Sequence, residues 1–355
     1  MTPRFHSLKI AEVRRETPDA VSLRFDLPSE LRADYAFVPG QHLALRTRLD
    51  GEEVRRSYSI CSGLDDGELR VAIKKVGGGR FSSWANDQLK AGDAIDVMTP
   101  DGRFTVPVDP AHAKHYVAFA AGSGITPILS LAKTLLRREP RSRFTLVYGN
   151  RRASTSMFQE ALEDLKDRHL ARFALFNVFS REEQEVALFN GRIDAAKVCA
   201  FLDALIPPAS IDEAFVCGPA SMIDEVEAAL HAAGVAAGHV HVERFGTPGA
   251  PSAQAEPAPD AALARVTFVV DGLRRDVQFR REHGSLLEAG AAAGLDLPFS
   301  CKGGMCCTCR AKLLEGQVKM RKNFALEQAD LDAGFVLTCQ SYPLSERVLL
   351  SFDDR

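Results

Sequence analysis

The spacing of hydrophobic and polar residues changes along the chain and divides it into three blocks. Up to about Phe104, short runs such as residues 21–25 and 69–73 alternate apolar and polar positions between turns, with almost no helical period. Alternation of this kind is typical of half-buried antiparallel strands. We therefore predict a small antiparallel β-barrel over residues 1–108.

In the second block, apolar β-type runs alternate with helical patterns. The runs cover residues 116–121, 144–148, 173–179, 214–217 and 240–242, and helical patterns cover segments such as 129–137 and 223–232. Strands that alternate with helices predict a doubly wound parallel sheet. We assign it to residues 112–246.

The third block begins after a segment without apolar period. Residues 247–262 carry four prolines among alanine, glycine and serine, a composition typical of a linker. Beyond it, runs at 265–270 and 276–279 flank Asp271-Gly272, which predicts a hairpin, and residues 285–293 have a helical pattern. Residues 263–355 are thus expected to form a small α+β domain of the β-grasp type.

Composition excludes several classes of protein. The formal net charge of −3 over 355 residues gives no basic field for nucleic acid or an anionic membrane. The charged N-terminal segment does not resemble a secretory signal, and the uncharged stretch 116–132 is interrupted by Gly122, Gly124 and Pro127. Eight cysteines are too few for a disulfide scaffold. We expect a cytoplasmic protein that binds neither nucleic acid nor membrane.

The cysteines of the third block carry the strongest chemical signal. Their spacing, C-x4-C-x2-C with one distant cysteine, is that of a plant-type [2Fe–2S] site with the ligands Cys301, Cys306, Cys309 and Cys339. Gly303 and Gly304 allow a tight loop, and Cys307 falls outside the spacing. A structural zinc site would need a second C-x2-C pair, and a thioredoxin-like motif would need a βαβ context.

Two glycine turns predict a nucleotide site in the second block. Gly122, Gly124 and Thr126 follow the first strand, and Cys217-Gly218-Pro219 ends the fourth. If the strand order is 3-2-1-4-5, both turns border the crevice where the order reverses, and a pyrophosphate can lie at the helix N-terminus after Gly124. The simpler interpretations are a plain glycine turn and a small buried core cysteine.

The first block contains residue types that suit a flavin. Arg56, Tyr58 and Ser59 occupy one predicted strand and offer a cation for phosphate, an aromatic face and a hydroxyl near flavin N5. A glycine run ending at Gly79 precedes Ser82 and Ser83 at a predicted helix start. These donors suit a second phosphate and favour FAD over FMN. Taken singly, each feature is also compatible with barrel packing or a turn.

Together, the strings R-x-Y-S, G-S-G-I-T-P and C-G-P-x-x-M with the C-terminal cysteine pattern resemble the ferredoxin–NADP reductase superfamily fused to a plant-type ferredoxin. The resemblance covers nearly the whole chain. It implies that Arg56, Tyr58 and Ser59 contact FAD, that Ile73 and Lys74 line its ribityl and adenine side, and that Gly79, Ser82 and Ser83 hold its pyrophosphate. It further implies that Gly122 to Thr126 and Cys217 to Pro219 bind the nicotinamide nucleotide. Phe245 takes the place of the aromatic residue that covers the flavin in simpler reductases.

The residues after the second and third strands of the second block bear on nucleotide choice. NAD-preferring domains usually place an acidic side chain on the adenine ribose. Here Arg151 and Arg152 follow strand two, and Ser180 and Arg181 follow strand three, which favours the 2′-phosphate of NADPH, with NADH as a possible substrate. The alternative is that these are solvated surface arginines.

Electron counting then predicts the order of transfer. NADPH gives up an electron pair, a [2Fe–2S] cluster takes single electrons, and a flavin converts between the two. The chain is expected to be an oxidoreductase in which Ser59 and Cys217 lie nearest the hydride path without acting as acid or base. The strings at 148–152, 179–184 and 243–246 resemble reductases of aromatic catabolism, which implies a separate di-iron oxygenase acting on an aryl-CoA thioester as acceptor.

Two other functions stay open at this point. A Rieske dioxygenase reductase has the same parts, and a non-catalytic iron–sulfur redox sensor belongs to a different class. The sensor would need a nucleic-acid-binding output that the sequence does not offer. Residues 264–355 carry 13 basic and 12 acidic side chains, a net charge of +1, so the third domain lacks a strongly acidic docking face.

Overall fold

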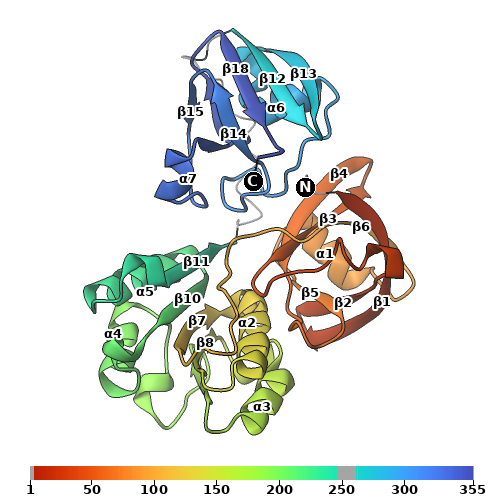
Figure 1. Cartoon of the computed structure of the whole chain (residues 1–355). Helices are drawn as coiled ribbons and strands as arrows, with labels where there is room; N and C mark the ends of the chain where they lie inside the picture. Colours follow the sequence, from red (N-terminus) through yellow and green to blue (C-terminus); the bar gives the residue numbers. More distant parts are fainter. Residues whose placement is uncertain (1–3, 246–260, 262, 355) are drawn as a thin grey trace.

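The computed structural model describes residues 4–245, 261 and 263–354. Three large sheets define three domains along the chain, and a two-stranded sheet belongs to the third (Figure 1). The C-terminal domain lies over the other two, with its loops directed towards them. The predicted linker falls almost wholly outside the described residues, since only Ala261 of it is covered.

The first domain is built from a six-stranded antiparallel sheet in the order β4-β3-β6-β1-β2-β5. Its strands are β1 (Phe5–Thr17), β2 (Ala20–Asp26), β3 (His42–Leu49), β4 (Glu52–Ser59), β5 (Leu69–Lys74) and β6 (Ala94–Met98). A bridge between Ile60 and Val71 joins the two end strands, so the sheet curls into the predicted barrel. Helix α1 (Arg80–Asp87) packs against it through Phe81 and Ala85, which are buried.

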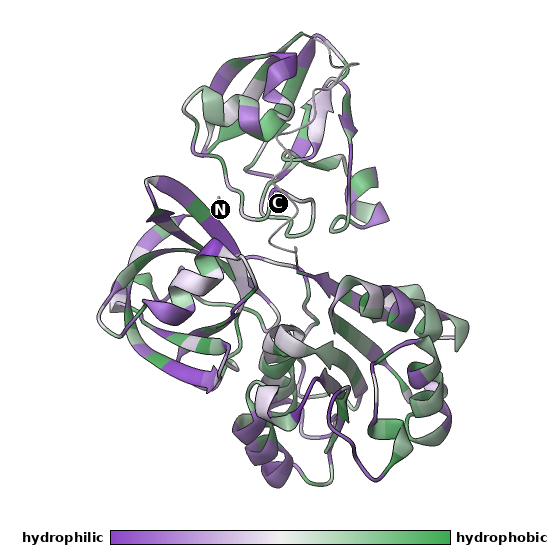
Figure 2. Cartoon of the chain, turned by 180° about the vertical axis from the view of Figure 1, so that it is seen from behind, coloured by the Kyte–Doolittle hydropathy of each residue, from purple (hydrophilic) through white to green (hydrophobic). Residues whose placement is uncertain are grey.

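The second domain has a five-stranded parallel sheet in the order β11-β10-β7-β8-β9, which is the order on which the predicted nucleotide site depends. The strands are β7 (His115–Ala121), β8 (Arg143–Asn150), β9 (Phe173–Phe179), β10 (Glu213–Gly218) and β11 (Val240–Arg244). The helices are α2 (Ile125–Arg138), α3 (Gln159–Arg168), α4 (Ala195–Ala204) and α5 (Ala220–Ala232). The inner strands are apolar and the outer face of α3 is polar (Figure 2). Among the described residues, none of the helices combines the length and apolar character that a membrane span requires.

The third domain is a mixed sheet, β13-β12-β18-β14-β16, with a two-stranded sheet beside it. Its elements are β12 (Ala264–Val270), β13 (Leu273–Phe279), α6 (Leu286–Ala292), β14 (Arg310–Glu315), β15 (Val318–Met320), α7 (Gln328–Asp332), β16 (Phe335–Leu337), β17 (Ser341–Pro343) and β18 (Arg347–Ser351). The predicted hairpin turns at Asp271 and Gly272, whose φ values are +50° and +74°. This architecture of barrel, parallel-sheet domain and α+β domain agrees with the sequence-based expectation.

The first two domains share a hydrophobic core, whereas the third domain has its own. One continuous cluster contains Phe104 from the barrel side and Phe215 from β10, whose rings pack edge to face at 5.5 Å. The third domain has a separate cluster that includes Phe268 and Phe352. The first two domains therefore form one packed unit, and the third carries its own core.

Candidate functional site

Strand β4 presents the three predicted flavin residues side by side. Tyr58 packs against Phe81 of α1 with ring centroids 5.5 Å apart, and burial raises the pKa of its phenol. Ser59 is buried at the end of the strand, while Arg56 donates to the carbonyl of Arg55 at 2.7 Å. The strand therefore offers an aromatic face, a hydroxyl and a cation along one line.

The turn before α1 holds the other predicted flavin residues. Gly79 precedes the helix, and the Ser82 hydroxyl accepts from the Val76 N–H at 3.1 Å and donates to the Gly79 carbonyl at 3.2 Å. Ser82 thus stabilises the turn itself, and Ser83 beside it is half-buried. On the neighbouring β5, Ile73 is buried and the Lys74 ammonium lies 3.7 Å from the Asp19 carboxylate.

The two glycine turns of the parallel-sheet domain meet as predicted. Gly122 has φ +55°, and a Cβ on Gly124 would lie 2.1 Å from the Cys217 carbonyl oxygen, so only glycine fits there. Thr126, in the first turn of α2, donates to the Ser123 carbonyl at 3.0 Å. The turn before α2 and the turn through Gly218 and Pro219 at the end of β10 therefore border one site.

A hydroxyl, a thiol and a carboxyl group converge where the barrel meets the parallel sheet. The Ser59 hydroxyl donates to Glu243 Oε2 at 3.1 Å, and Glu243 on β11 is in register with Cys217 on β10. Burial raises the pKa of Glu243 to about 8, despite the hydrogen bond from Ser59 that lowers it. Burial and the nearby Glu243 carboxylate raise the pKa of the Cys217 thiol.

Glu243 was missed as a site residue by the sequence analysis. It stands in the string 243–246 that carried part of the resemblance, but its pairing with Ser59 spans 184 residues. No local pattern signals such a contact. Phe245, two residues further along, is 37% exposed in this structure.

The predicted 2′-phosphate residues lie on two neighbouring loops. The Ser180 N–H donates to the Asn150 carbonyl at 3.0 Å and the Arg181 N–H to the Arg151 carbonyl at 2.9 Å. The side chains of Arg151, Arg152 and Arg181 are exposed at the carboxyl ends of β8 and β9. Glu182 accepts from the Ala153 N–H at 3.0 Å, which fixes one of the two acidic side chains that follow Arg181.

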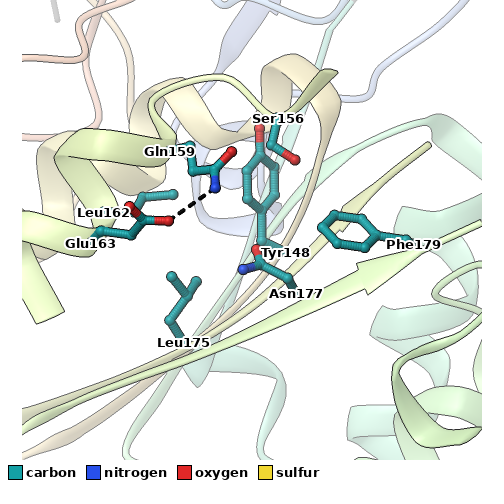
Figure 3. Close-up of a pocket in the computed structure, with 8 residues that line it drawn as sticks. All are labelled: Tyr148, Ser156, Gln159, Leu162, Glu163, Leu175, Asn177 and Phe179. Carbon is teal, nitrogen blue, oxygen red and sulfur yellow. Dashed lines mark hydrogen bonds between the residues drawn. The ribbon is translucent and has the colours of Figure 1, made fainter. Parts of the chain in front are cut away.

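A small cavity lies beneath these loops, between α3 and strands β8 and β9 (Figure 3). Tyr148, Asn177 and Phe179 line it, and Gln159 donates to Glu163 at 2.9 Å on its rim. Its volume of about 20 Å³ is room for about one water molecule. The cavity is therefore too small to hold a nucleotide.

The four predicted ligand cysteines lie together in the third domain. The thiol of Cys306 donates to Cys301, whose sulfur also accepts from the N–H groups of Gly303 at 3.3 Å and Met305 at 3.5 Å. These hydrogen bonds lower the pKa of Cys301 to about 6. The Cys309 pKa is raised, first by its hydrogen bond with Cys339 and then by burial, and the charges of Cys306 and Cys301 also reach it.

This donor set suits a two-iron cluster. The sulfurs lie in two hydrogen-bonded pairs, Cys301 with Cys306 and Cys309 with Cys339, within electrostatic range of each other. Backbone N–H groups already point at Cys301, which stabilises negative charge on a thiolate. Cys307 turns away from the set: its φ is +55° and its thiol donates to the Ala325 carbonyl at 3.2 Å.

The cysteine loop packs against the barrel next to the flavin strand. The Ser57 hydroxyl donates to the Ser300 hydroxyl at 2.7 Å, which links the residue before Tyr58 to the residue before Cys301. His42 Nε2 lies 3.4 Å from the Thr308 hydroxyl. These contacts place the two predicted redox sites side by side.

Ionic contacts surround this junction. Arg55, which is 6% exposed, donates to Asp296 at 2.9 Å and lies over the Phe299 ring at 4.1 Å. Arg103 forms an ion pair with Asp330 of α7. The predicted flavin and cluster sites are thus joined by a polar interface that the sequence pattern did not reveal.

Comparison with known families accounts for all three domains. Residues 7–106 match the model of an oxidoreductase FAD-binding domain, residues 119–228 an oxidoreductase NAD-binding domain, and residues 268–344 a 2Fe-2S iron-sulfur cluster binding domain. These ranges cover most of the barrel, the parallel-sheet domain from the end of β7 into α5, and the cysteine loop together with Cys339, respectively.

Similar proteins share this organisation from end to end. The chain is 44% identical over 349 residues to one component polypeptide of the 1,2-phenylacetyl-CoA epoxidase of Escherichia coli K12, with 98% of both chains covered. It is 32% identical to the ferredoxin reductase component of 3-ketosteroid-9-alpha-monooxygenase from Rhodococcus rhodochrous, covering 97% of this chain and 96% of that one. The structure of phthalate dioxygenase reductase has the same fold, with a TM-score of 0.59, 24% identity and 98% of both chains covered.

Proposed function

We propose a function from one premise: this chain belongs to the ferredoxin–NADP reductase-like family of oxygenase reductases with FAD-binding, NAD-binding and 2Fe–2S domains. It is an oxidoreductase of the reductase-component type. When bound, FAD accepts an electron pair from NADPH as hydride, and the [2Fe–2S] cluster passes single electrons to an acceptor protein. The observation that carries this proposal is the Ser57–Ser300 hydrogen bond, because it joins the flavin strand to the cysteine loop.

The proposed binding residues are those that the resemblance to the reductase family implies. For FAD they are Arg56, Tyr58, Ser59, Ile73, Lys74, Gly79, Ser82, Ser83 and Phe245. For the nicotinamide nucleotide they are Gly122, Gly124, Thr126, Ser180, Arg181, Cys217, Gly218 and Pro219. The cluster ligands are Cys301, Cys306, Cys309 and Cys339. The corresponding domains are proposed to span residues 1–108, 112–246 and 263–355, with a linker at 247–262.

Ser59, Cys217 and Glu243 are proposed to line the place where flavin and nicotinamide meet. Hydride transfer depends on orientation of the two rings and needs no general base. With its pKa raised to about 8, Glu243 is largely neutral at pH 7 and adds little charge beside the rings. The three residues therefore orient the reactants and exclude water.

NADPH is the proposed nucleotide, supported by the exposed arginines on the two neighbouring loops. Replacing Arg181 by Ala should raise the KM for NADPH about tenfold and leave the KM for NADH within about twofold, since a charge-assisted phosphate contact contributes on the order of 1.5 kcal/mol. Steady-state kinetics with both nucleotides measure this. Lys166→Ala, on α3, is the matched control. Equal effects on the two nucleotides would remove Arg181 from the site.

The proposed acceptor is a separate di-iron oxygenase that acts on an aryl-CoA thioester, and phenylacetyl-CoA epoxidase in phenylacetate degradation is the specific candidate. Its support is the 44% identity to the epoxidase component of Escherichia coli over nearly the whole chain. A Rieske-type oxygenase is the second candidate, because the fold is also that of phthalate dioxygenase reductase. We place the protein in the cytoplasm, where free thiols and a reduced pyridine nucleotide are both available.

The decisive experiment combines cofactor content with partner capture. Purified protein should contain one FAD and two irons per chain and reduce cytochrome c with NADPH over many turnovers. A redox sensor would stop after about one turnover. Tagged protein should recover a di-iron oxygenase from the lysate of its native host, and recovery of a Rieske oxygenase would replace the proposed acceptor while keeping the electron chain.

A further inference from the structure

The cysteine loop has two sides in different surroundings. On the inner side, Ser300 and Thr308 are 4% and 0% exposed and face Ser57 and His42 of the barrel. On the outer side, Gly303 and Met305 are half-exposed. A protein that approaches the loop in this arrangement can therefore reach only its outer side.

A second segment is fixed against that outer side. The Phe324 N–H donates to the Gly304 carbonyl at 3.0 Å. Gly304 has φ +78°, and a Cβ there would lie 3.1 Å from the Lys322 carbonyl oxygen, so the two chains run in close contact. Lys322 and Phe324 consequently lie next to the loop.

The side chains of this segment are turned towards solvent. Phe324 is 52% exposed and Lys322 is also exposed. Lys302 in the loop is already paired with Glu288 at 2.7 Å, whereas within the described part of the chain no carboxylate lies at ion-pair distance from Lys322. We call Gly303, Met305, Lys322 and Phe324 the outer rim.

We propose that the outer rim is the surface on which the oxygenase component docks, while the inner side of the loop stays on the barrel. This inference rests on the proposed function and names its docking surface. The partner is expected to place an apolar contact on Phe324 and a carboxylate beside Lys322. An exposed aromatic residue beside a charge is the composition of an interface anchor with a polar rim. In this arrangement the domain need not leave the barrel between receiving and passing an electron.

A charge reversal on the rim tests the proposal with cytochrome c, a basic protein, as the probe. Lys322→Glu should raise the NADPH-dependent rate of cytochrome c reduction about threefold or more at 50 mM salt. At 0.5 M salt the gain should vanish, because screening shortens the range of the interaction to a few ångströms. Ferricyanide reduction, which the flavin supports, should not change. Arg274→Glu makes the same charge change on β13, and an equal gain there would overturn the assignment.

Chemical coupling gives a readout that does not depend on turnover. A carbodiimide joins carboxylates to lysines, so the Lys322→Glu chain should couple to cytochrome c through residue 322, as mapped by mass spectrometry of the peptides. The product counted is the amide bond between the carboxylate at position 322 and a lysine of cytochrome c, which the wild-type chain cannot form because its residue 322 is a lysine. Coupling mainly through Asp296 or Asp330 instead would show that cytochrome c approaches the inner side, and would overturn the proposal.

A variant that weakens the contact between the barrel and the cysteine loop tests whether the acceptor uses the outer rim or the inner side of the loop. Asp296→Asn removes the carboxylate that Arg55 contacts across the junction, while Arg55 keeps Glu53 within the barrel. If one face of the loop served both the barrel and the acceptor, weakening that contact would speed cytochrome c reduction. We expect the rate of cytochrome c reduction to stay at the wild-type value. A higher rate would contradict the proposal that the acceptor docks on the outer rim. If the wild-type holoprotein reduces ferricyanide but never cytochrome c, the proposed function itself fails, whichever side of the loop is open.

Discussion

The two junctions of the barrel are built from different interactions. Towards the parallel-sheet domain, the barrel shares an apolar cluster in which Phe104 packs on Phe215, and Ser130 of α2 donates to the Ser62 carbonyl at 2.7 Å with no exposure. Towards the third domain, the contacts are ion pairs and hydroxyl groups, with separate apolar cores on either side. The first junction resembles a domain interior and the second a transient protein–protein interface.

This difference matches what each junction has to do. Hydride transfer needs two rings held in one orientation, which a shared core provides. Transfer of single electrons needs only proximity, and polar contacts of modest strength supply that without fusing the cores. We therefore predict that the reductase unit, formed by the barrel and the parallel-sheet domain, unfolds independently of the third domain. We also predict that salt weakens the second junction and leaves the first unchanged.

The largest effect should come from removing a predicted cluster ligand. Its loss should stop electron transfer across the second junction and leave the flavin reactions of the first two domains intact. Cys339→Ser should abolish iron binding and lower cytochrome c reduction at least tenfold, because the cluster loses one of four thiolates. FAD content and ferricyanide reduction should stay within about twofold of wild type. Cys307→Ser is the matched control and should keep its iron. Normal iron content in the Cys339 variant would contradict the ligand assignment.

The next effect concerns the shared core of the first junction. Phe104→Ala should lower the unfolding free energy of the reductase unit by about 3–5 kcal/mol, as expected for a large buried ring replaced by a cavity. The single tryptophan, Trp84, lies on α1 and reports unfolding of the barrel by fluorescence. Visible absorbance of the cluster reports the third domain, which should not respond.

Phe268→Ala in the core of the third domain is the counterpart of that experiment. It should shift the cluster transition and leave the fluorescence transition of Trp84 in place. If the fluorescence transition and the cluster transition shift together in either variant, the core of the reductase unit and the core of the third domain are not independent. That result would contradict the proposed difference between the two junctions.

A smaller, pH-dependent effect is expected from Glu243 at the first junction. Its folded pKa of about 8 is higher than the ordinary value of 4.5, so it contributes stability below pH 4.5 that is lost as the pH rises towards 8. Glu243→Gln should therefore gain stability relative to wild type between about pH 5 and 8, with the difference constant above 8. Urea unfolding followed by Trp84 fluorescence measures it, and a pH-independent difference would show that Glu243 is ionised in the folded protein.

The smallest effect should be seen at the ionic second junction. Arg103→Gln removes the ion pair with Asp330, and partly exposed pairs of this kind contribute about 1 kcal/mol or less. The radius of gyration from small-angle X-ray scattering should begin to increase at lower salt than in wild type. Arg138→Gln removes the ion pair with Asp65 at 3.0 Å beside the shared core and should cause no such increase.

Local patterns in the sequence account for most of the fold. The alternation between strands and helices predicted the parallel sheet, and the turn at Asp271-Gly272 predicted the hairpin, since both signals lie within a few residues of the structure they specify. The cysteine spacing placed Cys301, Cys306 and Cys309 in one loop for the same reason, whereas Cys339 is distant in the sequence, and the four stay predicted ligands. The loop around Cys301 is also held from outside, because the Phe324 N–H donates to the Gly304 carbonyl.

Contacts between distant residues could not be predicted in this way. From the sequence, Arg55 is expected to be an ordinary charged residue of an exposed strand. In the structure it is buried under Asp296 and Phe299, which are more than 200 residues away in the sequence. Glu243 looks like a polar position at the end of an edge strand, and only the approach of Ser59 identifies it. The burial of Arg55 and the pairing of Glu243 both depend on contacts between domains. The hydrophobic pattern of a single segment contains no information about such contacts.

The close contact between Gly124 and the Cys217 carbonyl has a consequence for how the enzyme can change. Any side chain at position 124 would push the turn before α2 away from the end of β10, so variants there lose the local fold before they gain a new preference. The loops that carry Ser180 and Arg181 are free of this restriction, because their side chains point into solvent. Directed evolution of nucleotide choice should therefore find its improved variants among these exposed loops and none at the glycine turn.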